Sequence, residues 1–214
     1  MTYFLQAHLS QDLFSTFLSN QYNYSITEIT KVQVAANLGG CVGGTVVGYL
    51  SQIIGRRFSI VMMCFLCGTL LYPYFFISGA GLYPTVFFMQ FFVQGAWGII
   101  PIHLIELSPA SYRAFVVGTS YQLGNLISAA SSTIEARISQ TFPLPPALED
   151  GVTTERFYYS PGMTIFLGCV LTYTIIVTAL GPERRGRDMV NDEDDLNADG
   201  LYDVGNQEMG HGKW

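Results

Sequence analysis

Charged residues are scarce in this sequence, and the few that it has are clustered. Asp, Glu, Lys and Arg make up 12% of the 214 residues, against about 25% in an average globular domain. None of the four lies between Arg57 and Glu106, and residues 32–55, 114–134 and 157–182 lack them too. A helix needs about 20 apolar residues to cross a hydrocarbon core of about 30 Å, and each window is that long. The sequence therefore predicts a helical membrane protein that crosses the bilayer several times.

We expect an all-α membrane protein with six transmembrane helices. The predicted spans are residues 2–18, 32–52, 58–77, 84–107, 113–135 and 161–180. Six spans place both termini on one side of the membrane, and Lys and Arg concentrate on the cytoplasmic side. With the termini inside, the residues inside are Arg56, Arg57, Arg113, Arg184, Arg185 and Arg187, and those outside are Lys31, Arg137 and Arg156. We therefore expect cytoplasmic termini, and a protein that resides in the plasma membrane.

Two regions are expected along the chain. Residues 1–182 form the transmembrane bundle, and residues 183–214 form a cytoplasmic tail that is acidic, poor in apolar residues and typical of disorder. This tail accounts for the net charge of −6, so the charge says little about partners, and nothing indicates nucleic-acid binding. The basic region and small-residue cleavage site of a secretory signal do not follow Met1.

Cysteine and histidine are too few, and too deep in predicted spans, to indicate a metal or redox site. Cys64 and Cys67 have the spacing of a metal or redox pair. However, the pair has no histidine nearby and lies in lipid, which favours plain packing. His103 and Glu106 supply two possible ligands, whereas a zinc site needs three or four. We therefore predict no metal and no cofactor.

One acceptor pattern for glycosylation lies on the predicted outer loop. Asn23, Tyr24 and Ser25 form the triplet Asn-x-Ser. Such triplets also occur by chance, and this one is close to the membrane, so Asn23 is a candidate and no more.

The first predicted span, which contains HLSQDLFST at residues 8–16, has one polar face. At 100° per residue, that face holds His8, Gln11, Asp12, Ser15 and Thr16. Polar and ionisable groups within a membrane usually face the bundle interior and mark the route of a substrate, ion or proton. His8 and Asp12 are four residues apart, close enough to pair, and histidine changes charge most readily near neutral pH. The alternative is a structural pair that holds this helix to its neighbour.

Two further spans carry polar stripes. In the fifth span the stripe is Gln122, Asn125, Ser128, Ser132 and Glu135, and in the fourth it is Gln90, Gln94, Trp97 and Pro101. Pro101 should kink its helix and free a carbonyl group. The alternative role of such amides is to hydrogen-bond one membrane helix to the next. We expect Glu135 at the outer membrane boundary, where a charge costs little.

The second span is rich in glycine. Its glycines are Gly39, Gly40, Gly43, Gly44 and Gly48, and they form overlapping small-xxx-small patterns. Such patterns let two helix backbones approach closely. We predict that this helix packs tightly against a neighbour.

Two loops resemble signatures of the major facilitator superfamily. The run GYLSQIIGRR at residues 48–57 resembles its G-x-L-x-D-x-x-G-R-R/K loop, with Gln52 in place of the acid. The run ELSPASYR at residues 106–113 is similar to the loop between helices ten and eleven. The resemblance implies that the six spans are helices seven to twelve, the C-terminal half of the fold. It also implies a cytoplasmic gate, where an acid and an arginine pair across helix ends, built here from Arg56, Arg57, Glu106 and Arg113.

A narrower resemblance is to the fungal monocarboxylate/proton symporters, the lactate and pyruvate permeases. HLSQDLFST resembles their helix-seven motif N-x-x-[S/T]-H-x-[S/T]-Q-D-x-x-x-T, from which Phe4 and Ala7 depart. The runs VQGAWGIIPIHLIELSP at 93–109 and YQLGNLISAASSTIEA at 121–136 are also similar to this family. The resemblance implies that His8, Gln11, Asp12 and Thr16 line the route of substrate and proton. Gln94 and Asn125 are further candidates for hydrogen bonds to a carboxylate.

The expected function is therefore proton-coupled transport of a small carboxylate, with no enzymatic activity. The expected partners are the carboxylate, protons, the lipid bilayer and a missing N-terminal half of six helices, because alternating access needs two bundles around a shared site. The alternative is a truncated membrane protein that transports nothing, or an assembly partner of other permeases. A hydrolase built on His8 and Asp12 would need a nucleophile that the sequence does not offer.

Overall fold

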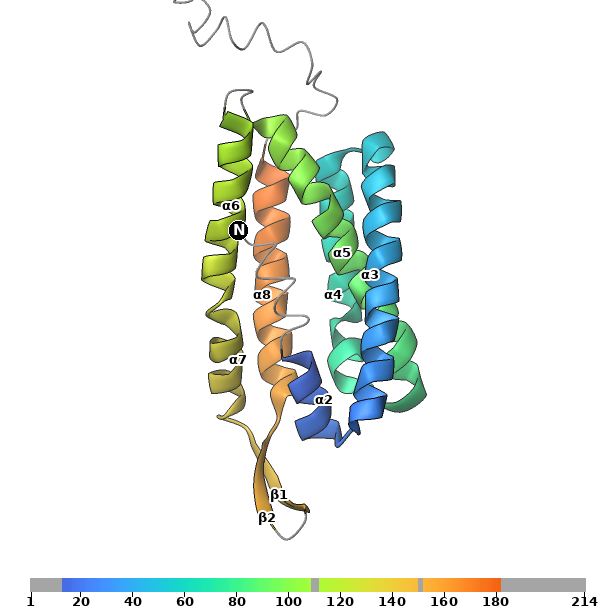
Figure 1. Cartoon of the computed structure of the whole chain (residues 1–214), viewed down its shortest axis with the longest axis vertical. Helices are drawn as coiled ribbons and strands as arrows, with labels where there is room; N and C mark the ends of the chain where they lie inside the picture. Colours follow the sequence, from blue (N-terminus) through green and yellow to red (C-terminus); the bar gives the residue numbers. More distant parts are fainter. Residues whose placement is uncertain (1–12, 109–111, 150–151, 182–214) are drawn as a thin grey trace, which may run out of the picture.

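A bundle of long helices forms the body of the computed structural model, which describes residues 13–108, 112–149 and 152–181 (Figure 1). Its elements are α2 Phe14–Tyr22, α3 Ile26–Ile54, α4 Arg56–Phe76, the 3-10 turn η1 Gly79–Gly81, α5 Leu82–Leu107, α6 Arg113–Ser128, α7 Ser131–Ser139, β1 Pro143–Glu149, β2 Val152–Phe157 and α8 Tyr159–Leu180. The strands project from one end of the bundle, which we call the hairpin end (Figure 1). At the opposite end α3 and α5 terminate and α4 and α6 begin, and we call it the arginine end.

Four helices are long and apolar enough to cross a membrane. They cover Ile26–Ile54, Arg56–Phe76, Gly79–Leu107 and Tyr159–Leu180, where the sequence predicts spans 32–52, 58–77, 84–107 and 161–180. Their outward faces carry large apolar side chains, such as Phe65 and Ile165, which are 65% and 66% exposed. The backbone N–H and C=O groups of these helices are hydrogen-bonded within each helix, and the outward surface is apolar. A protein surrounded by lipid needs both features. The described chain is thus a helical membrane protein by composition and architecture.

The other two predicted spans look different from the expectation. Residues 1–12 lie outside the described part of the chain, and α2 runs beyond Leu18 to Tyr22. The predicted span 113–135 is divided into α6 and α7, with a break at Ala129 and Ala130. Ser128 donates to the carbonyls of Gly124 and Asn125, and Ser131 donates to that of Ser128. Serine hydroxyls that bond back to helix carbonyls can bend a helix, and these bonds flank the break.

A β-hairpin between α7 and α8 was not predicted. β1 and β2 pair antiparallel, with a register irregularity between Leu144 and Ala147. Pro145 and Pro146 occupy that interval. Proline has no N–H to donate to a ladder, so it is confined to edges and bulges. Because β1 is rich in proline, residue propensity did not predict a strand there.

Glycines bring α3 against α5, as the small-xxx-small pattern predicts. A methyl group at Gly39 or Gly43 would overlap the backbone carbonyl of Phe87 or Phe91. A methyl group at Gly98 on α5 would lie 2.9 Å from the carbonyl oxygen of Gly44. The two backbones therefore touch over several turns, and α5 continues past Pro101 to Leu107 while they do so.

Candidate functional site: a polar pocket and a buried ion pair

The polar face predicted for the first span is only partly visible. His8, Gln11 and Asp12 lie outside the described residues, and Thr16 is exposed on α2. Its neighbour Ser15 accepts a hydrogen bond of 3.1 Å from Nε2 of Gln33 on α3. The opposite face of α2 is anchored by buried Phe14, Phe17 and Leu18, whose packing fixes its orientation. The polar face of α2 therefore continues onto α3.

A pocket of about 340 Å³ lies between α3 and α5. Its lining residues are Ala36, Asn37, Gly40, Cys41, Gln90 and Gln94. Gly40 makes room for it, because a methyl group there would lie 3.0 Å from Cγ of Gln94. Each of the three amide side chains offers two N–H donors and a carbonyl acceptor. The pocket can therefore hydrogen-bond a small polar or anionic molecule between two apolar helices.

Of the predicted route residues, Gln94 lines this pocket and Asn125 does not. Asn125 is half-buried on α6, where its backbone carbonyl accepts from Ala129 N–H and from the Ser128 hydroxyl. Gln122, one turn earlier, lies in an open groove on the surface of α6. Among the described residues, the pocket between α3 and α5 takes Gln90 and Gln94 from the predicted stripe of the fourth span and none from that of the fifth.

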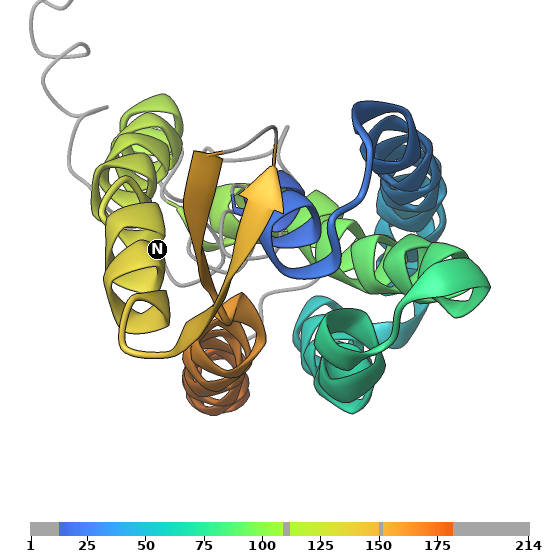
Figure 2. The ribbon, with the colours of Figure 1, turned by 90° about the horizontal axis from the view of Figure 1, so that it is seen from below.

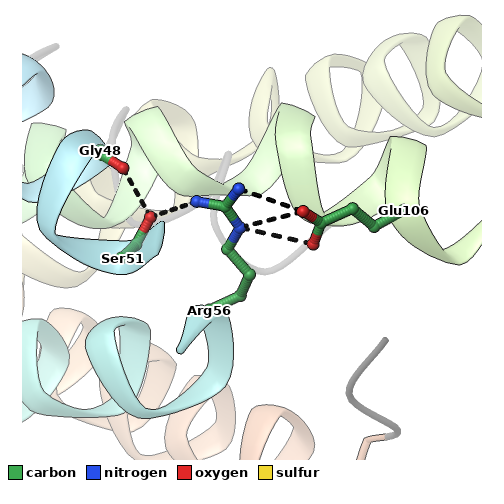
Figure 3. A network of polar contacts seen from close by, with 4 residues as sticks. All are labelled: Gly48, Ser51, Arg56 and Glu106. Carbon is green, nitrogen blue, oxygen red and sulfur yellow. Dashed lines mark hydrogen bonds and ion pairs between the residues drawn. The ribbon is translucent and has the colours of Figure 1, made fainter. Parts of the chain in front are cut away.

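At the arginine end, Arg56 and Glu106 form a buried ion pair (Figure 3). The guanidinium Nη2 lies 3.0 Å from Oε1 of Glu106, and Nε lies 3.2 Å from the same oxygen. Its remaining nitrogen, Nη1, donates to the hydroxyl of Ser51 at 2.6 Å, and that hydroxyl donates to the carbonyl of Gly48. The network joins the end of α3, the start of α4 and the end of α5. Loss of either partner would leave a buried charge uncompensated, which is costly.

Arg57 binds a different helix from Arg56. Its Nε donates to the carbonyl oxygen of Thr178 at 3.0 Å, and Nη2 donates to that of Ala179. These carbonyls belong to the last turn of α8, which leaves its final carbonyl groups without partners inside the helix. A positive charge is also favourable at a helix C-terminus. Arg113, the remaining predicted gate residue, begins α6 and is half-buried, so all four predicted gate residues lie at the arginine end.

The chain is similar to a curated protein of Saccharomyces cerevisiae, a carboxylic acid transporter protein homolog. The two are 38% identical over 203 residues, which is 91% of this chain and 33% of that protein. The chain thus spans about a third of the length of this relative. No protein-family model matches the chain.

Sequence reasoning missed Asn37 as a pocket residue and did not predict the burial of Glu135. Gln33, Asn37 and Cys41 recur every four residues along α3, and this spacing could have revealed Asn37 beside the glycines. Glu135 is 0% exposed, and its position at the outer membrane boundary stays a prediction. The spacing of polar residues predicted the helix face on which Glu135 lies. Whether that face is buried depends on how α7 packs against other elements, which spacing does not show.

Proposed function

We propose that this chain is part of a membrane transporter for small carboxylates, and that the pocket between α3 and α5 binds the carboxylate. Similarity to a protein named as a carboxylic acid transporter homolog, over 91% of this chain, carries the proposal. The amide-lined pocket supports it, because transporter sites lie between membrane helices near the bilayer midplane. The substrate class favoured by the helix-seven resemblance is a monocarboxylate such as lactate or pyruvate.

The pocket would hold the carboxylate with neutral donors. Residues 32–52 of α3 and 84–105 of α5 contain no Asp, Glu, Lys or Arg. A carboxylate there would be met by the amide N–H groups of Asn37 and Gln94, with Gln90 behind them. A hydrogen bond to a charged group contributes about 1.5–3 kcal/mol. Uptake of a proton with the anion would remove the cost of a net charge in lipid, which is the physical reason for proton coupling.

The proposed route reaches the pocket along α2. His8, Gln11, Asp12 and Thr16 would line the same route, because they precede or flank Ser15 in the sequence, and Ser15 is hydrogen-bonded to Gln33. Gln33 lies one helical turn before Asn37 on α3. Asn125 would join the route from α6, which lies across the bundle from α3 (Figure 2).

The arginine end would form the cytoplasmic gate. The pair of Arg56 and Glu106 ties the start of α4 to the end of α5, and Arg57 ties the same turn of α4 to α8. Arg113 would complete the group. In this proposal the gate faces the cytoplasm, the protein resides in the plasma membrane, and a second six-helix half completes the fold of the major facilitator superfamily.

Uptake of labelled lactate or pyruvate tests the proposal. Yeast cells without carboxylate uptake would express this chain alone, or together with the N-terminal six-helix half of a related permease. We expect uptake with the pair, inhibition by a protonophore, and loss of uptake in His8→Ala and Asp12→Asn. Thr85→Val on α5 is the matched control, since its hydroxyl donates to the carbonyl of Gly81, the residue that precedes this helix.

Two results would contradict the proposal in different ways. Uptake that His8→Ala and Asp12→Asn leave unchanged would refute the proposed proton route. Absence of uptake from a correctly inserted pair would favour a membrane protein that does not transport, or an assembly partner of other permeases.

A further inference from the structure

A second pocket, of about 450 Å³, lies at the hairpin end of the bundle, where α2 and α4 end and α3 and α5 begin (Figure 1). Its lining residues are Tyr22, Tyr24, Glu28, Ser78, Gly79, Ala80 and Tyr83. It shares none of these residues with the pocket that contains Gln90 and Gln94. Three phenol rings and one carboxylate therefore converge in a hollow that the proposed function does not use.

Hydrogen bonds to the backbone hold two of the three rings. The Tyr22 hydroxyl donates to the carbonyl of Phe75 at 3.1 Å. The Tyr24 hydroxyl accepts from Gly79 N–H at 2.7 Å. Gly79 has a φ of +77°, which glycine adopts without strain, and this turn presents its N–H to Tyr24. The rings of Tyr22 and Tyr24 are tilted by 47°, with centroids 6.1 Å apart, so they are fixed in place without stacking on each other.

Glu28 sets the sign of the charge in this pocket. Its Oε2 accepts from the backbone N–H and from the hydroxyl of Ser25, both at 2.9 Å. Ser25 is neutral, so these bonds orient the carboxylate and leave its charge in place. Lys31, about one turn further along α3, is exposed and does not line the pocket. Two helices end and two begin beside the pocket, so the partial charges of their dipoles largely cancel.

An organic cation is the class of ligand that this chemistry recognises. The face of an aromatic ring attracts a cation within about 6 Å of its centroid, and several rings together recognise quaternary ammonium groups. Tyrosine is also enriched at the boundary between membrane and water. The pocket lies at the start of two candidate membrane spans, Ile26–Ile54 and Gly79–Leu107. We therefore expect it at the level of the lipid headgroups.

We propose that this pocket binds a quaternary ammonium group. The rings of Tyr22, Tyr24 and Tyr83 contact its methyl groups, and the Glu28 carboxylate balances its charge. Two sources carry this chemistry, namely the headgroup of phosphatidylcholine and a free cation such as choline. The site is independent of the carboxylate pocket between α3 and α5.

Calorimetric titration with choline chloride tests the site. The sample is the whole chain in a maltoside detergent, which carries no ammonium group. We expect saturable binding of choline. Binding of 3,3-dimethylbutanol, which has the same shape without the charge, should be weaker by at least about fivefold. Equal binding of the two compounds would overturn the inference.

Variants of Tyr83 and Glu28 locate the binding. Tyr83→Leu should weaken choline binding about three- to thirtyfold, whereas Tyr83→Phe keeps the ring and should stay within about twofold. Glu28→Gln removes the charge and keeps the capping box, because glutamine also serves at this position. We expect it to weaken binding about two- to fivefold. The matched control is Tyr49→Leu, at an exposed position near the other end of α3.

Two outcomes with these variants would contradict the proposal. Choline binding that neither Tyr83→Leu nor Glu28→Gln changes would show that the cation binds elsewhere. Equal losses in Tyr83→Leu and Tyr83→Phe would attribute the effect to the hydroxyl and overturn the role of the ring. Because Glu28→Gln keeps the cap of α3, its result stays decisive if Tyr83→Leu does not fold.

Native mass spectrometry distinguishes the two sources of the ammonium group. The whole chain is released from nanodiscs that contain phosphatidylcholine and phosphatidylglycerol in equal parts. Retention of phosphatidylcholine by the wild type, and its loss in Tyr83→Leu and Glu28→Gln, would assign the site to a lipid headgroup. Choline binding without retained phosphatidylcholine would assign it to a free cation. Absence of both choline binding and phosphatidylcholine retention would overturn the inference.

Discussion

Arg56 and Glu106, 50 positions apart in the sequence, meet as a two-point ion pair that is almost completely buried. The resemblance to transporter loops implies an acid and an arginine paired across helix ends. The structure identifies Arg56 as a partner of Glu106 and adds Ser51 as the residue that orients the guanidinium.

We expect loss of either charge of this pair to destabilise the protein strongly. Arg56→Gln or Glu106→Gln leaves one buried charge uncompensated, which costs about 3–5 kcal/mol. The double variant should recover part of that loss, since no charge is then left alone. Thermal unfolding in detergent, with all three variants in one double-mutant cycle, measures the difference. If the double variant is as unstable as the sum of the single ones, the pair is not coupled.

Close contact between α3 and α5 makes Gly39 sensitive to the smallest substitution. Gly39→Ala should destabilise the bundle by about 1–3 kcal/mol, because the added methyl group overlaps a backbone carbonyl that cannot move without shifting α5. Gly48→Ala on the same helix has open space around it and is the matched control. Equal melting temperatures for the two variants would contradict the packing described for α3 and α5.

Gln21 should hold α2 to the start of α8. Its carbonyl oxygen accepts from the backbone N–H groups of Tyr159 and Ser160, both at 3.2 Å, and its amide donates to the Ser160 hydroxyl at 2.7 Å. Gln21→Leu removes these bonds at a cost of about 1–3 kcal/mol. We expect faster hydrogen exchange in the first turn of α8, whereas Gln52→Leu, at an exposed position of α3, should leave it unchanged. Unaltered exchange in Gln21→Leu would show that other contacts hold this end.

Ser25 combines a helix cap with the acceptor position of the glycosylation candidate Asn23. Its hydroxyl accepts from Glu28 N–H, and the Glu28 carboxylate accepts from Ser25 N–H, which makes a capping box. Ser25→Ala should cost about 1 kcal/mol in thermal unfolding, and Ser25→Thr should keep the stability and the acceptor pattern. A glycan at Asn23 would appear as a gel shift that endoglycosidase removes and that only Ser25→Ala abolishes. Equal stability of the two variants would mean that the cap contributes nothing.

The sequence predicted the long helices well because their signal is local. A run of 20 or more uncharged residues can be recognised without knowing its tertiary contacts, so the region around Ser59 to Phe75 was predicted to be a helix from composition alone. The break after Ser128 was not, since it depends on serine hydroxyls that bond back to carbonyls. The strand at Pro145 and Pro146 was missed because pairing with β2 overrides a sequence that disfavours strands.

The site was harder to predict than the fold, because it depends on contacts between distant segments. Asn37 becomes a pocket residue only when Gly40 and Gly43 bring α3 onto α5. Periodicity alone does not give the burial of Glu135, because the same spacing suits an exposed acid and one at 0% exposure.

Equilibrium binding of labelled lactate or pyruvate to the whole chain in nanodiscs tests the central claim, that the pocket between α3 and α5 holds a carboxylate. The account predicts saturable binding that falls at least tenfold in the Asn37→Leu, Gln94→Leu double variant. Binding should be unchanged in Thr45→Val, whose hydroxyl bonds within α3 to Cys41. Binding of equal strength in the double variant and the wild type would contradict the account.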